Sequence, residues 1–130
     1  MLEDRVVELA QGRNIAILTT LLPDGAPMSQ PHWIDTDGEH LILNTEVHRR
    51  KFRNIERDPR VTVTIVDPEN PYLYVEVRGR VVDTVTGPEA RSHVDELAQK
   101  YTGVDYAYPI QSERVIIRVA PDRQYIRQPR

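Results

Sequence analysis

Cysteine is absent from the 130-residue sequence, so disulfides, thiol nucleophiles and cysteine-ligated metals are all excluded. Long apolar runs are absent as well, and none approaches the roughly 20 residues that a membrane-spanning helix needs. The first residues, MLEDRVVELAQ, carry acidic side chains where a secretory signal peptide has a basic start. These absences predict a protein of the cytoplasm.

Common catalytic motifs are also missing. The sequence contains no glycine-rich phosphate loop, no Ser-His-Asp order and no paired-carboxylate motif. His40, His48 and His93 show no metal-ligand spacing with any carboxylate, so no metal site is expected. Hydrophobic residues make up 39% of the chain, which is enough for one core, and residues 1–130 are expected to form one domain.

Positive charge is concentrated in one short segment of an acidic chain. The net charge is −3, but residues 48–60 (HRRKFRNIERDPR) hold six Lys or Arg against Glu56 and Asp58, which gives +4 there and −7 elsewhere. A local basic patch on an acidic protein favours a site for one anionic ligand. The alternative, a nucleic-acid module, is disfavoured by the acidic remainder and by the lack of aromatic residues interleaved with the basic ones.

The pattern of apolar and turn-forming residues predicts closely spaced strands with three helices. Strands are expected over 15–22, 28–35, 41–45, 61–66, 72–83, 115–119 and, shorter, 124–126. Helices are expected over 2–11, 48–57 and 88–101. Gly79 lies inside a predicted strand and indicates a bulge or a bend. Strands at this spacing favour an antiparallel barrel over a parallel sheet.

The most informative segment is LNTEVHRRKFRN, residues 43–54. A strand ends at Thr45 and a helix follows within a few residues, which brings unpaired backbone N–H groups and a positive dipole end to this point. Arg49, Arg50 and Lys51 fall in the first helical turn, where cations are unfavourable unless an anion binds. The segment indicates a phosphate or carboxylate site, although a solvated basic helix face explains the pattern equally well.

A second candidate is SQPHWID, residues 29–35, which holds the single tryptophan of the sequence. On a strand, His32 and Trp33 point to opposite faces, so one ring could face a planar ligand. The favoured interpretation of Trp33 is nevertheless a core residue. His32 has the chemistry of an acid or a base, while a lone strand histidine is more often structural or exposed.

Three tyrosines, Tyr101, Tyr106 and Tyr108, cluster late in the chain, next to or within a loop expected over residues 102–113. They could line a pocket or cover the end of the barrel. Covering is the favoured interpretation.

Four ordered segments together resemble a known family. They are IAILTTLLPDGAPMSQPHW (15–33), GEHLILNTEVHRRKFRNIERDPRVTV (38–63), DPENPYLYVEVRGRV (67–81) and ERVIIRVAPDR (113–123). With the late helix and its YTG they span nearly the whole chain, and several ordered motifs are more specific than any one of them. On these segments the sequence resembles the pyridoxamine 5'-phosphate oxidase-like split-barrel family, in particular its F420-dependent oxidoreductase branch.

The resemblance implies a mainly β fold with flanking helices, an FMN-binding-type split β-barrel of six to seven antiparallel strands in a Greek-key-like order. It also implies a homodimer with the cofactor at the subunit interface. In this family the strand-end threonine and the basic residues after it lie near the cofactor, and the strand with the Pro-x-Trp pattern runs beside its ring. Carried over to this sequence, the cofactor-binding residues are Pro31, His32, Trp33, Thr45, Arg49, Arg50 and Lys51.

The activity that the resemblance implies is hydride transfer from reduced coenzyme F420 to an unidentified small organic acceptor. FMN is the alternative cofactor, because the basic segment serves FMN in some relatives, and a flavin or deazaflavin carrier without a substrate is the alternative function. A vitamin B6 activity is not expected, since the C-terminal Arg/His region of the true pyridoxamine phosphate oxidases has no counterpart here. No catalytic side chain is assigned, although His32 or a tyrosine could protonate the product.

Overall fold

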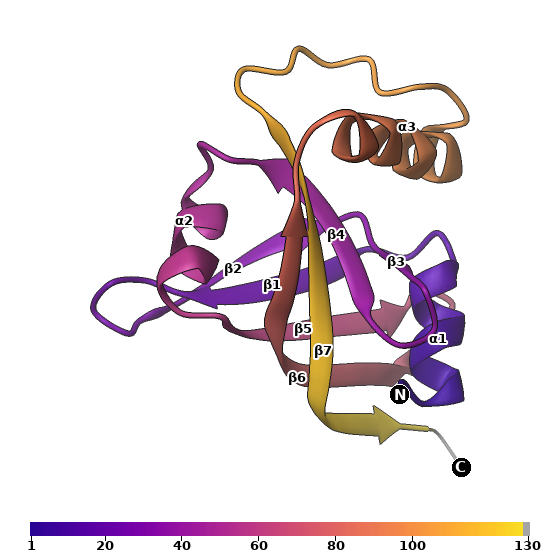
Figure 1. Cartoon of the computed structure of the whole chain (residues 1–130). Coiled ribbons are helices and arrows are strands. Elements are labelled where there is room, and N and C mark those ends of the chain that lie inside the picture. Colours follow the sequence, from indigo (N-terminus) through magenta and orange to yellow (C-terminus); the bar gives the residue numbers. More distant parts are fainter. Residues whose placement is uncertain (129–130) are drawn as a thin grey trace.

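Residues 1–128, which the computed structural model describes, contain seven strands in one antiparallel sheet of order β2-β1-β5-β6-β7-β4-β3 (Figure 1). The strands are β1 (Ala16–Leu21), β2 (Pro27–His32), β3 (Asp35–Thr36), β4 (Leu41–Glu46), β5 (Arg60–Asp67), β6 (Asn70–Val85) and β7 (Arg114–Arg127). The helices are α1 (Asp4–Gln11), α2 (Arg50–Arg57) and α3 (Pro88–Thr102). The predicted split-barrel fold with flanking helices is confirmed.

The sheet curls until its two edges lie close together. β2 and β3 stand at opposite ends of the strand order, yet only Trp33 and Ile34 separate them in the chain. Ile34 is fully buried at this crossing. The single strand predicted over 28–35 is therefore wrong: the chain leaves one edge of the sheet after His32 and joins the other edge at Asp35, because closing a barrel requires such a step.

Two long strands connect the halves of the barrel. β6 and β7 pair along most of their length, and the register shifts between Arg78 and Gly79, where a bulge or a bend was predicted. A Cβ on Gly79 would stand 2.1 Å from the carbonyl oxygen of Ala120, so only glycine permits this close approach. The strands predicted over 115–119 and 124–126 are one strand, since such irregularities let a continuous strand bend.

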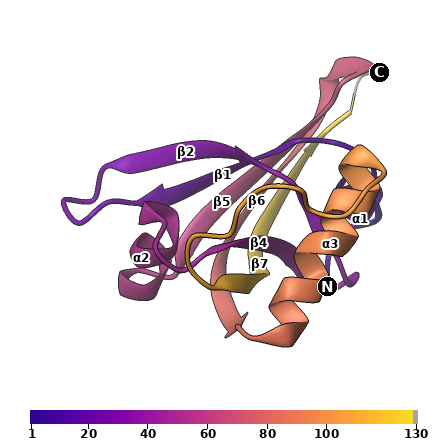
Figure 2. The ribbon, with the colours of Figure 1, turned by 90° about the horizontal axis from the view of Figure 1, so that it is seen from above.

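The core is the inside of the curled sheet, where alternate residues of each strand are buried. Side chains exposed by 2% or less include Leu18, Leu41, Leu43, Val63, Ile65, Val75, Val77, Val115, Ile117 and Val119. α1 packs against β3 and β5, α2 against β1, and α3 against the outer face of β4 and β7 (Figures 1 and 2). Apolar burial therefore fixes the positions of α2 and α3, the two helices that border the site.

The basic helix begins two residues later than predicted. α2 starts at Arg50, and Arg49 is its N-cap in an extended conformation without a side-chain capping hydrogen bond. Asn54 is fully buried and donates to the Thr20 hydroxyl of β1 at 3.0 Å, which ties α2 to the sheet. Among residues 1–128, no helix has the length and apolar character to cross a membrane.

Candidate functional site

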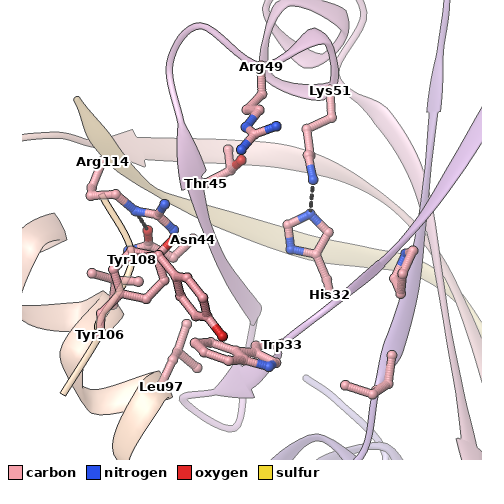
Figure 3. Close-up of a pocket in the computed structure, with 13 residues that line it drawn as sticks. His32, Trp33, Asn44, Thr45, Arg49, Lys51, Leu97, Tyr106, Tyr108 and Arg114 are labelled. Carbon is pink, nitrogen blue, oxygen red and sulfur yellow. Dashed lines mark hydrogen bonds between the residues drawn. The ribbon is translucent and has the colours of Figure 1, made fainter. Parts of the chain in front are cut away.

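A pocket of about 490 Å³ opens where β2, β4, the start of α2, α3 and the loop of residues 103–113 meet (Figure 3). Ligand pockets commonly have volumes of about 300–1,000 Å³. Its lining residues are Ile15, Pro31, His32, Trp33, Asn44, Thr45, Arg49, Lys51, Val94, Leu97, Tyr106, Tyr108 and Arg114. Polar and cationic groups from α2 lie at one side of the pocket, and aromatic rings lie at the other.

The predicted binding residues are brought together here with one exception. Six of the seven line the pocket, namely Pro31, His32, Trp33, Thr45, Arg49 and Lys51. Arg50 is exposed on α2 and does not belong to the lining. The side chains of Arg49, the N-cap of α2, and Lys51, its second residue, point into the pocket.

His32 and Lys51 form a hydrogen-bonded pair inside the pocket. The Lys51 Nζ lies 2.9 Å from the His32 Nε2, and the ammonium group donates to the imidazole (Figure 3). Burial, together with the charges of Lys51 and Arg114, lowers the pKa of His32 to about 3. Burial and the neighbouring charges of Arg49 and Arg114 lower the pKa of Lys51 to about 8. At neutral pH the pair is therefore a cation held by a neutral acceptor, and His32 is a poor candidate for an acid.

The aromatic side of the pocket is built on Trp33. Its ring stacks on Tyr101, with centroids 5.3 Å apart and planes 5° apart, and meets the edge of Tyr106 at 6.3 Å. The Tyr106 ring in turn lies 5.6 Å from that of Tyr108. The interpretations of Trp33 as a core residue and of Tyr106 and Tyr108 as mere cover are wrong, because all three line the pocket. His32 lines it as well, since β2 ends there and strand alternation stops.

α3 holds the Trp33 segment in place through polar contacts with Ile34, the residue that follows Trp33 between β2 and β3. The Tyr101 hydroxyl accepts a hydrogen bond from the Ile34 backbone N–H at 3.1 Å, and Lys100 Nζ donates to the Ile34 carbonyl at 2.6 Å. The same tyrosine hydroxyl donates to the Asn14 carbonyl at 2.5 Å. The indole is therefore fixed before any ligand binds.

Two polar lining residues, Asn44 and Arg114, were missed by the sequence analysis. Arg114 Nε donates to Asn44 Oδ1 at 2.8 Å, and Arg114 pairs in register with Glu46 across β4 and β7. Their sequence signal is weak, because polar residues at alternate positions of a strand usually indicate a solvent-facing side. Only α3, packed on that side, reveals that these groups are enclosed.

Glu46 anchors the loop that carries the tyrosines. Its carboxylate is 2% exposed, and Oε1 accepts hydrogen bonds from the backbone N–H groups of Gln111 and Ser112, both at 2.7 Å. Burial raises the pKa of Glu46, but these two hydrogen bonds and the charges of Arg114 and His48 outweigh burial and hold the pKa below its usual value. The carboxylate is thus ionised and fastens the end of the loop to β4.

The sequence profile of the pyridoxamine 5'-phosphate oxidase family matches residues 2–128. The chain belongs to this family. Members of the family are generally oxidoreductases that bind flavin, and the chain has their fold. Within residues 1–128, no group of three or more His, Asp or Glu side chains is arranged to hold a metal ion.

Solved structures agree with the family assignment. A protein named F420 reductase is 34% identical, with a TM-score of 0.83, over 96% of this chain and 98% of its own. The conserved hypothetical protein Rv2991 of Mycobacterium tuberculosis is 25% identical, with a TM-score of 0.78, over 98% of this chain and 84% of its own. General stress protein 26 of Bacillus anthracis is 21% identical, with a TM-score of 0.74, over 98% of this chain and 94% of its own, and shares the fold.

Proposed function

We propose that this protein is an F420-dependent reductase that transfers a hydride from the reduced deazaflavin cofactor to a small organic acceptor. The observation that carries the proposal is the pocket, in which cationic side chains lie opposite stacked aromatic rings. The 34% identity of the chain to a protein named F420 reductase supports it. FMN is the alternative cofactor, because flavin is what the family binds.

The pocket residues fit such a group. Arg49 and Lys51 would hold its anionic part, with the Thr45 hydroxyl beside them, while Pro31 and Trp33 would lie along its ring system. The bound cofactor would supply the hydride. The chain's own contribution is to fix the ring position through the stacked indole and to enclose the acceptor. His32 is neutral and accepts a hydrogen bond from Lys51, so it is a poor proton donor. Tyr106, Tyr108 or solvent would donate the proton that the product needs.

Cofactor preference is the first test of the proposal. Fluorescence titration of the purified protein with F420 and with FMN should show micromolar affinity for F420 and much weaker binding of FMN. Turnover of an acceptor dye with reduced F420 should then separate an enzyme from a carrier. Tighter binding of FMN would contradict the F420 assignment, and cofactor binding without any turnover would favour the carrier.

Cofactor binding should also depend on pH through Lys51. The pKa of Lys51 is lowered from 10.5 to about 8, so its charge is present below pH 8 and is lost as the pH rises through that value. We expect cofactor affinity to fall between pH 7 and pH 9, because an anion favours the ammonium form. In Lys51→Arg the charge persists, and affinity should stay flat over this range. A wild-type affinity that does not change with pH would contradict the placement of Lys51 against the anion.

We also propose a homodimer, and exposed apolar residues on the outer face of the sheet beside the pocket support it. Ile15, Ile17, Val66 and Tyr125 are between 37% and 51% exposed, and the pairing of Ala16 with Ile65 places Ile15 next to Val66. Ile15 also lines the pocket, so the exposed apolar strip continues into it. A second copy of the chain on this strip would cover both the apolar surface and the pocket mouth.

Light scattering at micromolar concentration should give about twice the 15.0 kDa chain mass. Ile17→Glu places a charge on the strip without touching the lining, so it should produce a monomer that binds cofactor at least about tenfold more weakly. A monomeric wild type, or a monomeric variant with unchanged affinity, would contradict the interface.

A further inference from the structure

Arg114 is a pocket cation that the assignment of cofactor-binding residues does not use. Its side chain is 10% exposed, and it lies opposite Glu46, whose Oε2 is 3.6 Å from the Arg114 Nη1. The guanidinium carbon lies 5.0 Å from the centroid of the Tyr106 ring. With Nε donating to Asn44, the guanidinium is held from three directions.

Asn44 is a positioning residue for this group. Its Nδ2 lies 3.0 Å from the Ala90 carbonyl oxygen, which only accepts hydrogen bonds, so the amide nitrogen must face α3. The second amide hydrogen points to the Nδ1 of His93, also at 3.0 Å. The amide oxygen is therefore left to face Arg114 and can accept from its Nε.

The Arg114 guanidinium retains N–H groups that can donate to a ligand. Arginine carries five N–H groups; Nε donates to Asn44, Nη1 lies 3.6 Å from Glu46 Oε2 and Tyr106 engages one further donor, which leaves at least two N–H groups for a ligand. Burial lowers the pKa of Arg114, and Tyr106 and Glu46 offset part of this effect. The described residues that line the pocket include no carboxylate, so apart from Glu46 beside Nη1 no negative charge competes with a ligand for the terminal amino groups. Such a fork matches a carboxylate, which it binds through two parallel hydrogen bonds.

We propose that Arg114 binds the carboxylate of the molecule that the protein reduces, and that the flat part of this molecule lies against Tyr106 and Tyr108. Figure 3 shows Arg114 and the two tyrosines on one side of the pocket and Lys51, with its histidine partner, on the other. The inference rests on the proposed function, because a cofactor anion at Arg49 and Lys51 leaves Arg114 for the second ligand. The substrate class is thus a small, planar, conjugated carboxylate.

The test uses benzoate as a probe and benzamide as its uncharged counterpart, titrated by calorimetry into protein saturated with cofactor. Wild-type protein should bind benzoate saturably and benzamide at least about tenfold more weakly. Arg114→Lys keeps the charge but loses the fork, so benzoate affinity should fall at least about tenfold while cofactor affinity is unchanged. Arg118→Lys is the matched control on the same face of β7, outside this pocket, and should leave both affinities as they were.

Three results would overturn the proposal: equal benzoate affinity in wild type and Arg114→Lys, displacement of cofactor by benzoate, or parallel loss of cofactor and benzoate binding in the variant. If Arg114→Lys does not fold, the wild-type comparison decides, and equal affinities for benzoate and benzamide refute the carboxylate site. Failure of the proposed function is a separate result, seen as no binding of F420 or FMN. Benzoate titration of the cofactor-free protein then still tests the dependence on Arg114.

Discussion

Replacing both Arg49 and Lys51 with alanine should weaken cofactor binding at least about tenfold. Both side chains line the pocket, and Lys51 is partly buried, which contributes to its lowered pKa of about 8. Each charge-assisted hydrogen bond to an anion contributes about 1.5–3 kcal/mol, while tenfold in affinity corresponds to about 1.4 kcal/mol. Fluorescence titration at two salt concentrations measures the loss, and added salt should weaken the wild type more than the variant.

The same variant should unfold, without ligand, at the temperature of the wild type or slightly above it. The half-buried Lys51 ammonium lies among other cations, so its charge does not stabilise the empty protein. The matched control is Arg13→Ala with Arg53→Ala, which removes the same charge from exposed positions outside the pocket and should leave affinity unchanged. Normal cofactor binding by the first variant, or a much lower melting temperature, would show that the basic turn is structural.

Glu46→Ala should cost about 3–5 kcal/mol in the free energy of unfolding. The change leaves the Arg114 guanidinium without its buried counter-ion and removes the acceptor of the Gln111 and Ser112 backbone N–H groups. Urea titration measures the loss. Glu76→Ala removes a carboxylate from an exposed pair with Arg78, and its effect should stay within about 1 kcal/mol.

The stability that Glu46 supplies should also depend on pH. Its pKa is lower in the folded protein than the ordinary value of 4.5, so the contribution is present above pH 4.5 and is lost as the pH falls below it. The difference between wild type and Glu46→Ala should therefore shrink in acid. Fluorescence of Trp33, the single tryptophan, should report the loosened loop at neutral pH, because Tyr106 contacts its ring. An equal difference at pH 3 and pH 7 would contradict a charged Glu46.

The strand content and the basic segment were predictable because both depend on local pattern. Alternating apolar residues place Val63 and Ile65 inside the barrel whatever packs around them. An irregularity at Gly79, a bulge or a bend, was predictable because a glycine in a strand often marks a close approach of another backbone. The split of the strand predicted over 28–35 was not predictable, since nothing in SQPHWID shows that its two ends join opposite edges of the sheet.

The sequence by itself determined the fold class, the family and six of the thirteen residues that line the pocket, because ordered motifs, turn residues and charge depend on positions close together in the chain. Tertiary structure decided what those residues do. It paired His32 with Lys51, decided between the core and the pocket for Trp33, and enclosed Asn44 and Arg114 beneath α3. These contacts join residues far apart in the chain, and the protonation of a histidine or lysine depends on the burial and the charges that such contacts create.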